Sequence, residues 1–395
     1  MSLSESIASE SSGIGRGDGS PRLKVVTIVG TRPEIIRLSS TIKRLDAFTN
    51  HVLVHTGQNY DYELNEIFFQ DLGLRAPDVF LGVDTSSLGA VLGSVLVKTE
   101  EVLLAEKPDA LVILGDTNSS VSALIAKRMK IPVYHMEAGN RSFDENVPEE
   151  INRRLVDHIA DYNLVYTEHA RRNLIAEGIH PARIMLTGSP MREVLAENAE
   201  TIARSDVLAR MNLHEGGFFL VSLHREENVD DPTRLASVLD ALGRLADEYS
   251  LPVLVSTHPR TRLRLQQQPD SLKGKLIFHP PFGFNDYIKL QQTARLVLSD
   301  SGTVSEESAI LGFPAVTLRD SIERPEALEV GAIITTGLSA MGISAAADYV
   351  ISVGRMAVAP DEYLVTNTSH RVVAFILSTA HSHHERRGIR RAALS

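Results

Sequence analysis

The chain has no cysteine among its 395 residues. Disulfide bonds, thiolate metal sites and a cysteine nucleophile are therefore excluded, and a reducing, cytoplasmic location is expected. No apolar run is long enough to span a bilayer, so we expect no membrane partner. Residues 1–21 lack the apolar core of a signal peptide, and their polar composition predicts a disordered leader.

Positive charge is also in short supply, because 40 lysines and arginines face 50 acidic residues and give a net charge of −10. A nucleic-acid-binding protein normally shows a basic face, so no nucleic-acid partner is expected. Neither GxGxxG nor a P-loop is present, so a nicotinamide cofactor is unsupported. No tight spacing of histidine and aspartate indicates a metal site, and the histidine-rich residues 381–395 are interpreted as a solvated tail. We therefore expect no cofactor and no metal.

Short β-branched runs alternate with amphipathic stretches from residue 23 onward. One series of runs begins at residues 24, 51, 110, 131, 163 and 184, and a second at residues 218, 252, 275, 295, 314 and 332. Nearly continuous apolar strands separated by helices predict parallel sheets that are covered on both faces. The expected fold class is α/β with two Rossmann-like, doubly wound domains, residues 22–190 and 191–366, because a polar stretch after Ser189 suits a hinge.

The residues that follow the predicted strands are unusually polar. In parallel α/β sheets, ligands bind beyond the carboxyl ends of the strands. We therefore expect the chemistry in a cleft where the polar strand ends of the two domains face each other: Thr31 and Arg32, His55 to Gln58, Asp116 to Asn118, Glu137, His224 to Glu226, His258, and Ser299 to Gly302.

Two of these segments suit a diphosphate. LSDSGTVSEES, from residue 298, turns at Gly302 into a helix whose free N–H groups favour an anion, and Glu306 or Glu307 can accept bonds from ribose hydroxyls. The alternative is a simple capping box from Thr303 to Glu306. VGTRPEIIR, from residue 29, places Arg32 at a helix entrance, where it can clamp a diphosphate or pair with a surface carboxylate.

A third segment, EAGNRSFDENVPEEINRR from residue 137, is densest in ionisable groups. Spacing of four residues puts Glu149 beside Arg153 and Glu150 beside Arg154, which also fits an exposed, salt-bridged helix start. Asp116 and Glu137 end strands of the same predicted sheet. Three carboxylates are thus expected to converge, with His224 and His258 facing them from the second domain.

The motifs GTRPE, GDT, EAGNR with PEEINRR, HREEN, and DSGTVSEE with ERPE follow one another between about residues 24 and 337. As a set they resemble the non-hydrolysing UDP-N-acetylglucosamine 2-epimerases. The resemblance implies a GT-B fold with a deep interdomain cleft, a UDP-sugar substrate, a homodimer and no metal. It also implies that residues 367–395 form a last helix returning to the first domain, followed by the basic tail.

Matched position by position, the resemblance implies a role for each motif residue. The implied catalytic residues are Asp116, Glu137, Glu149 and His224. The implied UDP-sugar contacts are Arg32, Arg37, Arg153, His258, Phe282, Ser301, Gly302 and Glu307, with the uracil packed near residues 282–284.

The chemistry agrees with this set of residues. C2 of a 2-acetamido sugar is not adjacent to a carbonyl, so inversion requires elimination of UDP to a glycal and re-addition, with acid–base groups on both faces of C2 and a cradle for the leaving diphosphate. Arg37 stands where bacterial relatives usually have lysine. Together with HTGQNYDYELNEIFF, from residue 55, it resembles the branch that forms UDP-N-acetyl-L-fucosamine for surface polysaccharides, and it argues against an activating UDP-sugar site. The alternatives are a GT-B glycosyltransferase, a hydrolysing 2-epimerase and a non-catalytic UDP-sugar sensor.

Overall fold

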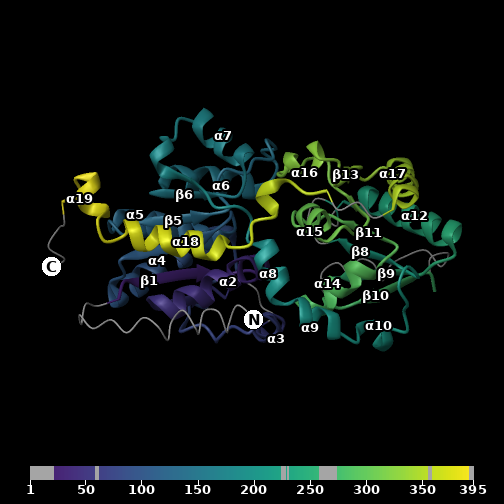
Figure 1. The fold of residues 1–395 in the computed structure, drawn as a ribbon, viewed down its shortest axis with the longest axis horizontal. Coiled ribbons are helices and arrows are strands. Elements are labelled where there is room, and N and C mark those ends of the chain that lie inside the picture. The colour runs from purple at the N-terminus through teal and green to yellow at the C-terminus, as the bar shows by residue number, and fades with distance from the viewer. Residues whose placement is uncertain are drawn as a thin grey trace. The chain divides into compact units, whose positions relative to one another are not determined.

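The computed structural model describes residues 22–57, 62–223, 228, 231–257, 274–354 and 358–390. Tertiary contacts divide the chain into two compact units (Figure 1). Unit 1 runs to Glu197 and resumes at Val365, whereas unit 2 extends from Asn198 to Leu364. The C-terminal segment thus belongs to the same unit as the first strands.

Unit 1 is built on a seven-stranded sheet in the order β3-β2-β1-β4-β5-β6-β7, in which every neighbouring pair is parallel. The three central strands are buried along almost their whole length, as expected for a sheet covered on both faces. The strands are β1 (Lys24–Val29), β2 (Asn50–His55), β3 (Val79–Phe80), β4 (Ala110–Leu114), β5 (Val133–Met136), β6 (Tyr162–Val165) and β7 (Ile184–Leu186).

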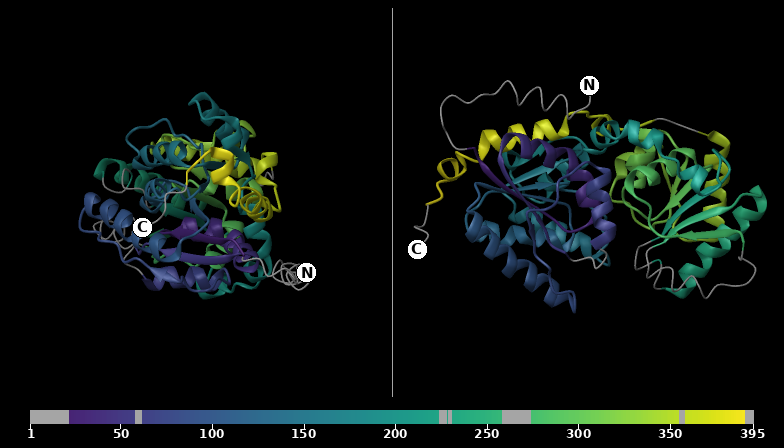
Figure 2. Two further views of the ribbon diagram at one scale, coloured as in Figure 1. Left: turned by 90° about the vertical axis from the view of Figure 1, so that its left-hand side faces the viewer. Right: turned by 90° about the horizontal axis from the view of Figure 1, so that it is seen from below.

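Helices cover both faces of this sheet (Figure 2). On one face α2 packs against α8 and the C-terminal α18, and α4, α5 and α6 form a second contiguous layer. The helical elements are α2 (Arg32–Phe48), α3 (Tyr62–Asp71), α4 (Leu88–Glu106), η1 (Asn118–Val121), α5 (Ser122–Arg128), α6 (Pro148–Ile159), α7 (Glu168–Ala176), η2 (Pro181–Arg183), α8 (Met191–Glu197), α18 (Thr368–Thr379) and α19 (His383–Arg387).

Unit 2 repeats the design with a six-stranded parallel sheet in the order β10-β9-β8-β11-β12-β13. Its strands are β8 (Phe219–Leu223), β9 (Val253–Thr257), β10 (Leu276–His279), β11 (Leu296–Ser299), β12 (Ala315–Thr317) and β13 (Ile334–Thr335). Its helices are α9 (Ala199–Arg204), α10 (Val207–Arg210), α12 (Pro232–Tyr249), α14 (Phe284–Thr293), α15 (Val304–Leu311), α16 (Pro325–Glu329), α17 (Ala340–Val353) and η4 (Asp361–Tyr363).

The core of unit 2 lies where α12 and α17 pack on the sheet, and it joins Leu242 and Ile343 to strand residues such as Val255 and Leu298. The predicted α/β class with two parallel sheets is therefore confirmed. Within the described part of the chain, no helix is both long enough and apolar enough to cross a membrane.

Candidate active site

The carboxyl edge of the unit 1 sheet carries the acidic residues predicted from the strand ends. Asp116 lies two residues beyond β4 and Glu137 directly follows β5. Glu137 has a left-handed backbone with φ of 60°, which costs a residue with a Cβ about 1 kcal/mol or more. A non-glycine residue held in this conformation at the end of a strand points to a functional position.

Four charged side chains form an alternating chain at this edge. Arg37 pairs with one oxygen of Glu137, and Nη2 of Arg153 lies 3.3 Å from the other. Arg153 also pairs with Asp116 and donates through Nη1 to the Glu137 carbonyl at 2.6 Å. Arg37, Glu137 and Arg153 are buried, and 15% of the Asp116 side chain is exposed. Arg153 lies between Glu137 and Asp116, and Glu137 lies between Arg153 and Arg37, so the ion pairs hold all four side chains in place.

Glu34, in the first turn of α2, accepts hydrogen bonds from the loop after β1 and from the loop after β4. Its Oε2 accepts backbone N–H bonds from Gly30 (2.9 Å) and Thr31 (2.7 Å), and its Oε1 accepts from the Thr117 and Ser119 hydroxyls. Burial raises the pKa of this carboxyl despite these bonds. Thr31 and Glu34 have the spacing of a capping box, and this local signal identifies Glu34 in the sequence.

Asp157 on α6 supports the loop after β5 in a similar way. Its carboxylate lies 2.7 Å from Nη1 of Arg141 and 3.0 Å from Nδ1 of His135, and it accepts the Gly139 N–H at 3.2 Å. Burial tends to raise the pKa of Asp157, but the bonds and charges of His135 and Arg141 outweigh it and lower the pKa. This network could not be predicted from the sequence, because its members do not follow one periodic pattern.

The alternative of a salt-bridged helix start on α6 holds for only one of the two pairs that the spacing allows. Arg154 Nε donates to Glu150 at 2.9 Å, as predicted, and Glu150 also accepts the Ser142 N–H at 2.8 Å. The pairing of Glu149 with Arg153 is wrong, because Arg153 binds Asp116 and Glu137 instead. Glu149 is partly buried, and no side chain in the described ranges donates to its carboxylate.

In unit 2, the turn after β11 leads into α15. The alternative of a capping box is wrong here, because the Thr303 side chain caps no backbone N–H of α15. Glu306 is instead fully buried, with one oxygen 3.4 Å from Nη1 of Arg324. Glu307 accepts a bond of 2.6 Å from Gln291. The start of α15 therefore keeps backbone donors that can serve an anion.

The other predicted contacts are placed as follows. The Phe282 ring stacks on His279, with centroids 4.0 Å apart. The Arg32 guanidinium lies over Phe68, 5.8 Å from its centroid. His224, His258 and the segment Gln58–Asp61 lie outside the described residues. In the part of the chain that is described, no group of three or more histidines and carboxylates has the arrangement of a metal site.

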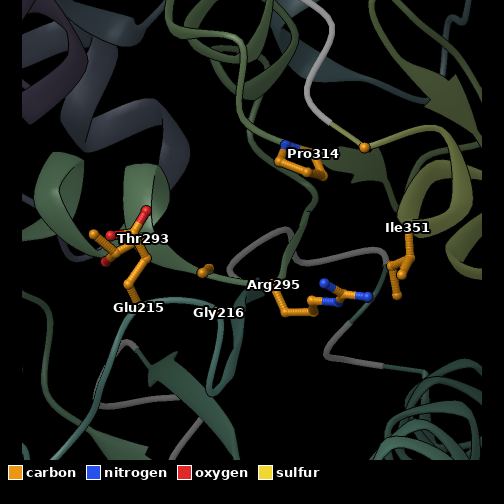
Figure 3. A pocket seen from close by; sticks show the side chains of 8 residues that line it. Glu215, Gly216, Thr293, Arg295, Pro314 and Ile351 are labelled. Carbon is orange, nitrogen blue, oxygen red and sulfur yellow. The ribbon is translucent and has the colours of Figure 1, made fainter.

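A cavity of about 160 Å³ lies elsewhere in unit 2 (Figure 3). Its walls come from residues that precede β8, β11 and β12 and from the end of α17: Glu215, Gly216, Thr293, Ala294, Arg295, Pro314, Ile351 and Gly354. It therefore belongs to the amino ends of the strands, opposite the edge that carries Ser301 and Gly302.

Comparison with known proteins identifies the family to which the chain belongs. The family model described as UDP-N-acetylglucosamine 2-epimerase matches residues 41–377. The chain belongs to this family. A solved UDP-N-acetylglucosamine 2-epimerase from Rickettsia bellii is 44% identical with a TM-score of 0.87, and the match covers 92% of this chain and 98% of that one. This likeness confirms the GT-B type of fold, and the family assignment favours an isomerase over a glycosyltransferase.

Two further relatives of the family differ in what they bind or act on. The Methanocaldococcus jannaschii UDP-GlcNAc 2-epimerase, solved in complex with UDP-GlcNAc and UDP, is 37% identical with a TM-score of 0.84, over 90% of this chain and all of that one. A UDP-2,3-diacetamido-2,3-dideoxy-D-glucuronate 2-epimerase from Pseudomonas aeruginosa is 38% identical over 80% of this chain and 88% of its own length.

Proposed function

We propose that the protein inverts C2 of a UDP-linked 2-acetamido sugar without hydrolysing it. The observation that supports this best is the convergence of Asp116 and Glu137 on Arg153 at the carboxyl edge of unit 1, beside the helix that carries Glu149. A site that only binds a nucleotide sugar has no need of several carboxylates, because they repel the diphosphate.

In the proposed reaction a carboxylate takes the proton from C2, and the C2–H electrons form the C1–C2 double bond of a glycal. The C1–O bond breaks, and its electron pair leaves with UDP. A second group then protonates the opposite face of C2 while the UDP oxygen re-forms its bond to C1. This reaction needs no oxidant or reductant, and the product has the same atomic composition as the substrate.

The contacts of each carboxylate suggest its role. Glu137 lies between two arginines that hold its carboxylate in place, so we assign it to electrostatic support. Glu149 forms no ion pair with a described residue, so we assign it to proton transfer. Asp116, partly exposed and sharing one arginine, is the second proton-transfer candidate. His224 stays a prediction from the family resemblance.

Unit 2 is proposed to hold the nucleotide. Ser301 and Gly302 are proposed to contact the diphosphate, together with backbone donors at the start of α15; the Ser301 N–H itself bonds Oγ of Ser299 at 3.0 Å. Glu307 presents a carboxylate to the ribose, with one oxygen oriented by Gln291. Phe282, stacked on His279, supplies an aromatic surface for the uracil. Arg32, Arg37 and Arg153 are proposed to contribute from unit 1, and His258 stays a prediction.

The proposed sugar is N-acetylglucosamine or the 6-deoxy L-talo sugar that precedes N-acetyl-L-fucosamine, as a precursor of surface polysaccharide made in the cytoplasm. A homodimer is also proposed. One helical layer of unit 1 exposes large apolar side chains, as surfaces that bind a second copy do. They are Val97 and Leu104 of α4, Leu124 of α5, and Ile151 and Leu155 of α6.

The proposal is tested by proton NMR of the UDP-sugar in D₂O. Incubation with the protein and no acceptor is expected to replace H2 by deuterium and to produce the C2 epimer while UDP stays attached. Release of UDP with free sugar would indicate a hydrolysing enzyme, and binding without exchange would indicate a sensor. In a parallel incubation with the UDP-6-deoxy-L-talosamine derivative, a higher kcat/KM than with UDP-N-acetylglucosamine is expected if the resemblance to the L-fucosamine branch holds.

A further inference from the structure

Arg319 is a buried arginine at the carboxyl edge of the unit 2 sheet. It follows β12 by two residues and is only 4% exposed. Its Nη2 donates to Oε1 of Glu323 at 2.7 Å. Among the described residues Glu323 is the only partner of this guanidinium, so most of its five N–H donors lack an acceptor.

The Nη1 group of Arg319, which bonds no described residue, lies next to Gly302 in the turn before α15. Its nitrogen atom lies 3.3 Å from the position that a Cβ on Gly302 would occupy, and no other described atom outside residues 301–303 comes within 4 Å of that position. β11 and β12 are neighbours, with Ser299 paired to Thr317, so the two strand ends share one edge. An anion seated beside Gly302 would therefore meet both the backbone donors and Nη1.

Other charged groups around this turn also contact residues of unit 2. Arg324 donates from Nε to the Gly302 carbonyl at 3.0 Å, and its Nη1 is 3.4 Å from Glu306. Asp300 accepts from Asn228 at 3.1 Å. The Arg319 donors that bond no described residue can therefore bond an anionic ligand seated beside Gly302.

We propose that Arg319 binds the diphosphate of UDP, with Glu323 fixing one arm of the guanidinium while the other faces the ligand. This inference rests on the proposed function. As the C1–O bond breaks, its electron pair moves onto the departing phosphate oxygen, and the N–H donors of Arg319 stabilise the added charge. The guanidinium contributes a positive charge and N–H donors and transfers no proton. Arg319 thus adds a side-chain contact to the helix start, Ser301 and Gly302.

The test compares Arg319→Gln with Arg295→Gln, which removes the same charge at the opposite end of β11. Arg295 is exposed, has no partner among the described residues and lines the cavity of Figure 3. Calorimetric titration with UDP is expected to show about 10- to 100-fold weaker binding for Arg319→Gln, the usual effect of losing charge-assisted bonds, and no change for Arg295→Gln. Uridine, which lacks phosphate, should bind both variants like the wild type.

Wild-type UDP affinity in an Arg319→Gln protein that still binds uridine would overturn the inference. If that variant loses uridine binding as well, Arg319→Lys decides the question. A lysine keeps the charge but not the fork, so UDP affinity should fall by about 5-fold or more while uridine is unaffected. Equal UDP affinity in the lysine variant would overturn the inference too. Wild-type protein that binds UDP but shows no exchange at C2 would remove the proposed reaction and leave the Arg319 contact standing.

Discussion

The carboxylates at the carboxyl edge of unit 1 differ in how firmly the protein holds them. Glu137 contacts two buried arginines, Asp116 contacts one, and Glu149 contacts none of the described cations. A proton carrier has to change its charge during turnover, whereas a fixed charge is best surrounded by partners. Loss of each carboxylate should therefore affect catalysis and stability to different extents.

Glu137→Gln, Asp116→Asn and Glu149→Gln are each expected to lower kcat on the order of 10²- to 10⁴-fold, the range for a lost acid, base or charge stabiliser. Glu137→Gln should also lower the free energy of unfolding by about 1–3 kcal/mol, because Arg37 and Arg153 lose their shared partner. Glu149→Gln should change it by less than about 0.5 kcal/mol. Steady-state kinetics and urea titration of the same samples measure both effects. Near-normal C2 exchange in all three variants would show that the carboxylates are only salt-bridge partners.

The location of a functional residue could be predicted from the sequence where it depends only on the residue's place at the end of a strand. Asp116 and Glu137 were placed by the rule that parallel strands end at one edge, and the structure brings both to Arg153. The partners of Arg153 could not be predicted, because spacing of four residues on a helix does not reveal acceptors that follow other strands. Glu34 and Ser119 are 85 residues apart, and Arg319 depends on a turn from the neighbouring strand. No local pattern carries such information.

At the scale of elements, the loop from β5 to α6 determines where Glu137 lies. Gly139 has φ of 80°, and a Cβ there would lie 2.5 Å from the Ala170 carbonyl oxygen and 2.9 Å from Leu174 Cγ on α7. The loop can pack this closely on α7 only because residue 139 is glycine. Gly178, just after α7, has a similar φ of 85° but nothing within 4 Å of its added Cβ.

Gly139→Ala is therefore expected to cost about 2–4 kcal/mol of stability, from backbone strain and from the clash with α7. Because Glu137 is two residues away, kcat should also fall on the order of 10²-fold. Gly178→Ala shares only the strain, so it should cost about 1 kcal/mol and leave kcat unchanged. Thermal unfolding and kinetics of the two variants separate these effects. Equal losses in both would show that contact with α7 does not hold the loop.

The sheets were more predictable than the loops, because a buried strand is a recognisable run of apolar, β-branched residues. The strands predicted near residues 24, 51, 110, 131, 163 and 184 all form in unit 1, as do those near 218, 252, 275, 295, 314 and 332 in unit 2. β3 was missed, because it has only two residues and Phe80 is 51% exposed. A strand that short has no hydrophobic period to detect.

At the scale of the whole molecule, the exposed layer of α4, α5 and α6 is the surface through which we expect two copies of the chain to form a dimer. Gly89, Gly93 and Val97 recur every four residues on the exposed face of α4, followed by Leu104, which is 51% exposed. Small residues at this spacing allow a second helix to approach closely. In a symmetric dimer the same patch faces its own copy, so one added charge appears twice at the interface.

Val97→Glu is therefore expected to weaken self-association by about 10²-fold or more, since each tenfold change in Kd corresponds to about 1.4 kcal/mol and two like charges would be buried together. Sedimentation velocity at micromolar protein should show a dimer for the wild type and a monomer for this variant. Ile175→Glu is the matched control, because Ile175 is a β-branched residue of the same unit, 45% exposed on α7, outside the α4–α6 layer. It should stay dimeric. A wild type that sediments as a monomer would refute the dimer, whereas a dimeric Val97→Glu protein would place the interface on another surface.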